Sequence, residues 1–462
     1  MQSRRDQVQA QSYVVSRVTA ALVAAEPDGP ESPHRRTVVG TISGALVAAL
    51  VVAGFVVFGF MSPGAAGGWR APGTLIVEKE TGNRYVLAGD RLHPVLNYAS
   101  ALLLFKDPPQ VVSVSRKSLR QVTHGAAVGI VGAPDALPAA GAVARQVWTV
   151  CALVTHDPAG AVTTATTLAV DQQARPDRPL GPDEALVAAG GEQTFLVWRG
   201  RRLRLTQPWI ARALGYDAAA LPVGAGWLES VPVGPDVVPV TVPGRGGAGP
   251  PVDGGPSRIG ELFVSRSPER FFVLQSDGLT ELTPVAYALV AADPSTAGLY
   301  AGKPAVPREL SPGALTSLPV SRRSAVPAEV PANRPALVQA PEGRTWCVRQ
   351  SMADGRVEVT AAPPVPASGV AIDVVGVTRD VYTAAVVGIA PGVGGLVLPG
   401  RVDQAAGTEY FLVTDAGVKY PLAGAAVARK LGYPPESARP VPRRLLEMLP
   451  TGPLLRPAPS GG

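Results

Sequence analysis

The longest apolar stretch of the chain covers residues 38–61, and no charged residue occurs between Thr37 and Trp69. As an α-helix, these 24 residues would rise about 36 Å, against about 30 Å of bilayer hydrocarbon. A buried core helix is the alternative, but few helices of soluble proteins are apolar on every side over such a length. The pattern therefore predicts one transmembrane helix over residues 37–61.

Positive charge flanks this segment on one side. Arg35 and Arg36 directly precede it, with His34 beside them, whereas the next positive residue after it is Arg70. The positive-inside rule then places residues 1–36 in the cytoplasm and residues 62–462 outside it, on the periplasmic side of the cell membrane. A cleavable signal peptide is disfavoured, because 36 residues come first and the apolar stretch exceeds a signal h-region. We expect a single-pass protein of the cell (inner) membrane.

The cytoplasmic piece contains one amphipathic pattern. Val8, Val15, Val18 and Leu22 follow one another at intervals of 7, 3 and 4 residues, which places them on one face of a helix. The prolines that follow end this helix. We interpret the apolar face as a docking surface for a cytoplasmic partner; a solvated helix or one lying on the membrane surface is the alternative.

Beyond the membrane, four stretches share one plan: a short strand that opens with or near an aromatic residue, a polar turn, a second strand, and an Ala/Leu-rich helix. They begin at Arg84, Phe195, Phe271 and Tyr410. A proline follows each second strand, where it ends pairing and can open a helix: Pro94, Pro208, Pro284 and Pro421. Each stretch therefore predicts a hairpin packed on a helix. We interpret them as duplicated repeats, with chance resemblance as the alternative.

These patterns predict an α+β protein in which four hairpin–helix repeats surround a central β-rich domain with pseudo-twofold halves. With 51 glycines and 48 prolines in 462 residues, many short elements are expected. The expected boundaries are the repeats at 70–138, 186–230, 258–330 and 396–450, the central domain from 139–185 and 331–395, a Pro/Gly-rich connector at 231–257 and a flexible tail at 451–462.

The chain has two cysteines, Cys151 and Cys347. Two are too few for a zinc ribbon, an iron–sulfur cluster or a disulfide-dense small fold. Both lie in the expected central domain, and each follows a tryptophan, Trp148 or Trp346. Since the predicted compartment is oxidising, we expect a Cys151–Cys347 disulfide that joins the two halves. Two separate buried thiols are the alternative.

Composition and motifs argue against nucleic-acid binding and against catalysis. The net charge is +6 and the arginines are scattered, without the basic stripe of a nucleic-acid-binding protein. The four histidines stand in no triad pattern. Glu78 and Glu80 would share a strand face with Lys79 between them, which indicates surface salt bridges. No cluster has metal-ligand spacing. We therefore expect no catalytic, cofactor-binding or metal-binding residue.

Two glycine-containing stretches were candidates for phosphate binding. A P-loop needs GxxxxGK[ST], but Gly302-Lys303 is followed by Pro304. The glycine-rich stretch at 388–400 has no Lys or Ser/Thr at the required offset, and we interpret it as a turn into the fourth hairpin.

Five features together resemble one protein family, EccB of actinobacterial type VII (ESX) secretion systems. They are RRDQVQAQSYVVSRVTAAL at 4–22, the single apolar span, EKETGNRYV at 78–86, LHPVLNYAS at 92–100 and GAPDALP at 132–138. The resemblance implies a membrane-anchored core component that assembles with the FtsK-like ATPase EccC, EccD, EccE and a mycosin protease. It also implies repeats that look like a phage-lysin cell-wall-binding fold around a disulfide-bonded centre.

Three functions remain open at this point. The first is a structural subunit of the secretion channel, which self-associates. The second is a module that anchors the machine to peptidoglycan. The third is an ATP-hydrolysing component, because members of the family carry an ATPase label; ATP would be a cofactor only in that case.

Overall fold

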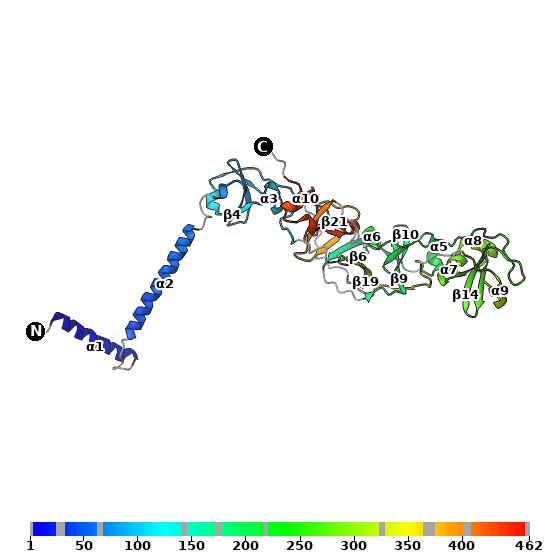
Figure 1. Ribbon diagram of the computed structural model, residues 1–462, viewed down its shortest axis with the longest axis horizontal. Helices are drawn as coiled ribbons and strands as arrows, with labels where there is room; N and C mark the ends of the chain where they lie inside the picture. The colour runs from blue at the N-terminus through cyan, green and yellow to red at the C-terminus, as the bar shows by residue number, and fades with distance from the viewer. Residues whose placement is uncertain are drawn as a thin grey trace. The chain divides into compact units, whose positions relative to one another are not determined.

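The computed structural model describes residues 3–24, 33–61, 68–139, 146–156, 158–171, 178–216, 220–322, 329–363, 375–400 and 408–457. The chain divides into two compact units, and each is described by itself (Figure 1). The N-terminal unit contains Met1–Leu92 and Gln110–Gly125. The large unit contains His93–Pro109 and Ala126–Gly462.

Two long helices open the N-terminal unit: α1, Arg4–Ala24, and α2, Pro33–Met61. Helix α2 contains the span Thr37–Val57, which is long and apolar enough to cross a membrane, with a mean hydropathy of 2.2 and no part of it buried. Among the described residues it is the one helix with these properties. The helix starts at a proline, which fits the first helical position because its missing N–H would have no partner there. The predicted membrane helix is therefore present as a candidate span.

A small sheet follows in the same unit, with the strand order β4-β1-β2-β3-β5. Strand β1 pairs antiparallel with β2 and parallel with β4. Trp69, Ile76, Leu92, Val114 and Leu119 form the core beneath it. The elements are the 3-10 helix η1 (Gly68–Arg70), β1 (Thr74–Glu78), β2 (Arg84–Ala88), β3 (Arg91–Pro94), β4 (Gln110–Val114), α4 (Arg116–Leu119) and β5 (Thr123–His124).

A six-stranded sheet with the order β20-β7-β6-β18-β19-β8 lies at the centre of the large unit. Its strands come from both halves of the chain: β6 (Val147–His156), β7 (Val162–Val170), β8 (Arg178–Pro179), β18 (Thr345–Ser351), β19 (Val357–Ala362) and β20 (Val386–Ile389). Antiparallel pairing of β6 with β18 sets Cys151 directly opposite Cys347, and the two form a disulfide. The predicted disulfide is confirmed.

Three smaller sheets of the large unit repeat the order seen in the first sheet. In each, the first strand pairs antiparallel with the second and parallel with a late, short strand, and the third strand lies outermost. The strands are β9 (Glu184–Gly190), β10 (Gln193–Trp198), β11 (Arg201–Leu205), β12 (Leu221–Pro222); β13 (Leu262–Arg266), β14 (Glu269–Gln275), β15 (Gly278–Leu282), β16 (Arg308–Glu309); and β21 (Gly395–Pro399), β22 (Tyr410–Val413), β23 (Lys419–Leu422), β24 (Arg439–Val441). Short strand β17, Ala336–Leu337, adds to β9.

The predicted helices follow the hairpins and pack in pairs. Helix α3 (Tyr98–Leu104) contacts α10 (Ala425–Lys430), and α5 (Pro208–Ala213) contacts α7 (Pro284–Ala292). Pro208 and Pro284 open their helices as predicted, but Pro421 lies inside β23 and Pro94 ends β3. The remaining short helices are α6 (Ala225–Ser230), α8 (Pro294–Ala297), η3 (Gly298–Tyr300), α9 (Pro312–Ser317), η4 (Pro435–Ser437) and α11 (Arg443–Glu447).

Two expected boundaries need correction. The connector at 231–257 has no helix or strand of its own, but Val237, Val240 and Val242 are buried in the core that contains α5 and α7. It is therefore a packed, extended segment and not a free linker. The expected tail at 451–462 is also folded in its first part, because Leu455 bridges to Leu422 and is fully buried. Residues 458–462 lie outside the described residues.

Candidate functional site

Helix α1 presents the face that the sequence singles out for docking. Val8, Val15, Val18 and Leu22 have exposed fractions between 53% and 81%. Such exposure leaves the face open for another protein or a membrane surface to cover. The docking role itself stays a prediction. His34, Arg35 and Arg36, which predict the orientation of the span, have side chains outside the described part of the structure.

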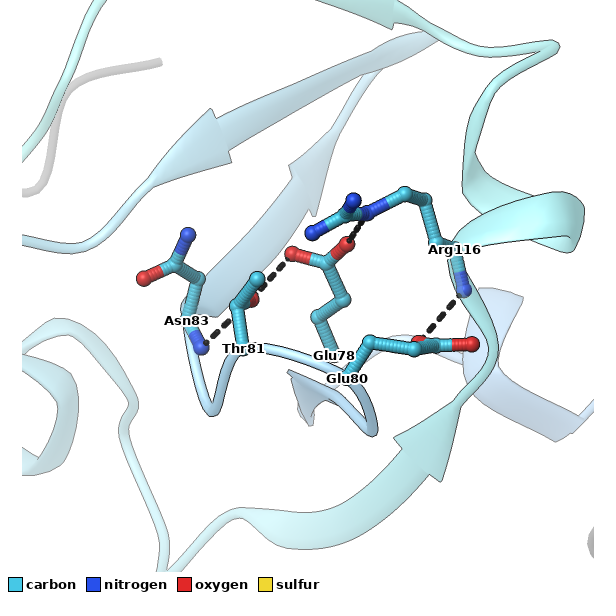
Figure 2. A network of polar contacts seen from close by, with 5 residues as sticks. All are labelled: Glu78, Glu80, Thr81, Asn83 and Arg116. Atoms are coloured by element: carbon cyan, nitrogen blue, oxygen red, sulfur yellow. Dashed lines mark hydrogen bonds and ion pairs between the residues drawn. The ribbon is translucent and has the colours of Figure 1, made fainter.

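The turn after β1 and the start of α4 form a polar cluster around the two glutamates (Figure 2). Glu78 is only 5% exposed, and its Oε1 accepts a hydrogen bond from Arg116 Nε at 2.5 Å. Its Oε2 accepts one from the Thr81 hydroxyl. Glu80 Oε2 accepts from the backbone N–H of Arg116 at 2.9 Å, and Asn83 N–H donates to Thr81 Oγ1 at 3.3 Å.

This geometry corrects the expected arrangement of the carboxylates. Glu78 ends β1, whereas Glu80 lies in the following turn, so the two do not share a strand face. Glu78 is also buried and not a surface residue. The hydrogen bond from Arg116, and after it the one from Thr81, holds the pKa of Glu78 below its ordinary value. Both carboxylates are committed to α4, so they do not form a general acid–base pair.

A hollow of about 300 Å³ adjoins this cluster. The Tyr85 and His124 rings meet edge to face beside it, with their centroids 5.7 Å apart. Its remaining wall includes the side chains of Arg116, Leu119 and Arg120. Because Arg116 pairs with Glu78, Arg120 supplies the remaining positive charge of the wall, and the hollow is suited to an anion more than to a cation.

A second hollow, of about 280 Å³, lies in the large unit between α6 and α11, beside Tyr382. Glu229 is shared there by two arginines: Arg202 Nη2 lies 2.9 Å from its Oε1, and Arg444 Nη1 lies 3.0 Å from its Oε2. Arg202 is buried. The shared carboxylate joins α6 to α11, so its charges are used for structure.

Lys419 in β23 is a buried cation that was not among the expected functional residues. Its Nζ donates to the carbonyl oxygens of Leu446 and Leu449, at 2.7 and 2.8 Å, where α11 ends. Burial lowers the pKa of Lys419, while Asp380 and Glu447 act in the opposite direction. An ammonium at a helix C-terminus neutralises the partial negative charge there. No pattern in the sequence indicated this burial, because the alternation of Val418, Tyr420 and Leu422 assigns Lys419 to the opposite, solvent-facing side of the strand.

The glycine-rich stretch at 388–400 connects β20 to β21, and β21 pairs with β22. The N–H of Gly392 donates to Asp415 Oδ2 at 2.9 Å. A Cβ at Gly394 would lie 2.4 Å from Pro138 Cγ. A phosphate loop needs free amides before a helix, whereas here a carboxylate takes the amide and a strand follows. The predicted turn into the last hairpin is therefore present.

The other phosphate candidate, Gly302-Lys303, follows the short helix η3 in an exposed turn and does not begin a helix. Over the described ranges, no group of three His, Cys, Asp or Glu side chains is placed to hold a metal ion. His93 Nδ1 lies 2.8 Å from the carbonyl oxygen of Ala126, which gives it a structural partner.

The family model described as "Type VII secretion system ESX-1, transport TM domain B" matches residues 1–460. The chain belongs to the EccB family. It is therefore a component of a type VII secretion system, with one candidate membrane helix and a large β-rich body.

EccB relatives match along most of their length. The chain is 28% identical to "ESX-3 secretion system ATPase EccB3" of Mycolicibacterium smegmatis, over 98% of this chain and 89% of the relative. It is 27% identical to "ESX-5 secretion system ATPase EccB5" of Mycobacterium marinum, over 98% and 92%. The term ATPase is part of the names of these relatives.

Solved EccB structures show the same fold. A chain of an intact ESX-5 inner membrane complex matches with a TM-score of 0.62 and 24% identity, over 99% of this chain and 94% of that one. A chain of an EccB3 dimer from the ESX-3 core complex matches with a TM-score of 0.60 and 25% identity, over 83% and 98%.

Proposed function

We propose that this chain is a structural core subunit of a type VII secretion complex, anchored by α2, whose extracytoplasmic body assembles the outer part of the channel. The observation that carries this proposal is the family match over nearly the whole chain, together with the candidate span and the β-rich body that follows it. The described polar clusters support a structural role, because their charges are committed to holding short helices in place. No cofactor takes part in this proposal.

The finer topology and partners belong to the same proposal. The N-terminus is cytoplasmic, as Arg35 and Arg36 indicate. The exposed face of α1 docks on EccC or EccD, and the extracytoplasmic body meets further copies of itself, EccE and the mycosin protease. The dimer named for the EccB3 structure supports self-association.

Duplication is also part of the proposal. Four strands have the same order in all four small sheets, although β5 extends the first sheet and β17 adds to the second. This shared order supports four repeats from a common unit. The helix pairs α3–α10 and α5–α7 support pseudo-twofold halves, because they join the first repeat to the last and the second to the third.

A detergent pull-down of the tagged full-length protein from native membranes, read by mass spectrometry, tests the complex. We expect an FtsK-like ATPase and multispanning partners to be recovered. A triple variant, Val8→Asp with Val15→Asp and Val18→Asp, should insert normally but recover far less of these partners. Recovery of the protein alone, from cells that express the other components, would contradict the proposal.

ATP hydrolysis is the second candidate, favoured by the names of the relatives. Purified full-length protein should show no phosphate release above a mock preparation, since the described glycine turns offer no free phosphate loop. Turnover that survives further purification would establish an enzyme. Peptidoglycan anchoring is compatible with the structural role, and binding of the full-length protein to purified cell-wall sacculi would show it.

A further inference from the structure

Positive charge beyond the membrane helix is concentrated in the small sheet of the N-terminal unit. Residues 68–92 and 110–125 contain seven basic and three acidic residues, a net charge of +4. The whole of residues 68–462 has a net charge of +5. Nearly all of the excess therefore belongs to the first folded segment after the span.

The cations of this sheet gather where the β1–β2 turn meets α4. The N–H of Lys79 donates to the carbonyl of Val114 at 2.9 Å, which places the turn beside the residues that lead into α4. Lys79, Arg116, Lys117 and Arg120 are all exposed there. We call these four residues the cationic end.

The nearby acids neutralise one charge of the cationic end, that of Arg116, and leave the other three. Glu78 is buried against Arg116, and Glu80 accepts from the backbone of the same residue. Over the described residues, no carboxylate pairs with Lys79, Lys117 or Arg120. The hollow of about 300 Å³ opens at the same place, and its wall includes Arg120 beside the Glu78–Arg116 ion pair. A guanidinium without a carboxylate partner, next to Lys79 and Lys117, is suited to a phosphodiester group.

The covalent chain keeps the cationic end close to the membrane. Helix α2 ends at Met61, and Trp69 is already buried in the core of the sheet. The eight residues from one to the other can extend at most about 28 Å. Basic clusters held this close to a bilayer are attracted to anionic headgroups.

We propose that the cationic end binds anionic phospholipid headgroups of the membrane that α2 spans. The binding fixes the first sheet against the bilayer. The proposal rests on the membrane anchoring by α2 stated under the proposed function, and it adds the lipid as a specific partner.

Hydrogen exchange of the full-length protein in nanodiscs tests this. We expect the amides of residues 114–124 to exchange more slowly in discs that contain phosphatidylglycerol than in discs of phosphatidylcholine alone, and high salt should remove the difference. In the variant Lys79→Glu with Lys117→Glu and Arg120→Glu, the difference should disappear. A charge-reversal control in the large unit, Arg212→Glu with Lys303→Glu, should behave as the wild type. Equal exchange in both discs, or an unchanged difference in the triple variant, overturns the proposal.

Neutral substitutions are a control for misfolding, because removing a charge disturbs the fold less than reversing it. Lys117→Gln with Arg120→Gln removes both charges but keeps unbranched polar side chains, and each charge removed should weaken the protection about fivefold. Inorganic phosphate added to phosphatidylcholine discs should not protect the segment; if it does, the site binds free phosphate and the lipid assignment is wrong. Two further measurements test the proposals on which this one rests. Resistance of each variant to alkaline extraction shows that α2 still anchors it in the membrane, and recovery of its partners shows that it still joins the secretion complex. If both are normal while the lipid-dependent protection is absent, only the lipid-binding proposal has failed.

Discussion

At the scale of single residues, buried charges hold short helices in place. Glu78 is committed to the start of α4, and Lys419 to the end of α11. Buried Asp293 and partly buried Arg245 form another such pair, 3.6 Å apart, and Asp293 also caps α8 through the N–H of Ser295. Helices of four to six residues have few internal hydrogen bonds, so side chains at their ends supply much of their stability.

Glu78→Gln is expected to lower the stability of the first sheet at neutral pH. Arg116 holds the pKa of Glu78 below its value in the unfolded chain, which is about 4.3. The stabilisation is therefore complete above the unfolded pKa and is lost as the pH falls through the folded pKa. Thermal melts should separate the variant from the wild type at about pH 7, and the difference should shrink as the pH falls below the unfolded pKa toward the folded one. Glu342→Gln, at an exposed position, is the control; equal melting of E78Q and wild type at neutral pH would refute the role.

The polar cluster around Glu78 and Glu80 could not be predicted in full from the sequence. Alternation indicated that Glu78 and Glu80 were neighbours, but the partner, Arg116, is 38 residues from Glu78. Only the parallel pairing of β1 with β4 brings it there. The two cysteines were easier, since a pair of residues in an oxidising compartment leaves one possible bridge.

At the scale of elements, the repeat plan contained the second and third strands of each small sheet but not its first strand or its late strand. The first strands are buried runs such as Glu184–Gly190, which lack the alternation of a half-exposed strand. The closing strands can be as short as Leu221–Pro222, too short to produce any pattern. Pro421 was expected to open a helix, but α10 begins only after Gly424, whose φ of 103° suits glycine.

Gly278→Ala is expected to weaken the hairpin of β14 and β15. Gly278 has a φ of 138°, and a Cβ there would lie 2.0 Å from the carbonyl oxygen of Pro319. The strained backbone alone costs about 1–3 kcal/mol, and the contact adds to it. Gly298→Ala is the matched control, because no atom lies within 4 Å of its Cβ and its φ is −60°. Denaturant melts should show a clear loss for G278A and none for G298A; similar stability of the two variants would mean that the hairpin relaxes freely.

At the scale of the whole molecule, the fold class followed from the sequence, but the way the segments pack did not. The prolines and glycines of the connector at 231–257 predict a linker, but its valines are buried in the core that contains α5 and α7. The proline and glycine content of the segment correctly predicts its extended backbone. The burial of its valines depends on the surfaces of the second and third hairpins, and contacts between residues far apart in the chain form these surfaces.

The disulfide joins two segments that are far apart in the chain. Cys151 and Cys347 are 196 residues apart, and the loop that they close contains two complete small sheets. Constraining so long a loop in the unfolded chain stabilises the fold by up to roughly 5 kcal/mol. The ladder between β6 and β18 and the core around Trp148 do not depend on the bond.

Cys151→Ala with Cys347→Ala should therefore fold and still recover its partners, but with a melting temperature well below that of the wild type. Reductant should lower the melting temperature of the wild type toward that of the variant and leave the variant unchanged. If reductant lowered the melting temperatures of the wild type and the variant equally, its effect would not be due to this disulfide. If neither reductant nor the double substitution lowered the melting temperature, the central sheet would owe its stability to its ladder and core alone, and the bond between the two halves would be dispensable.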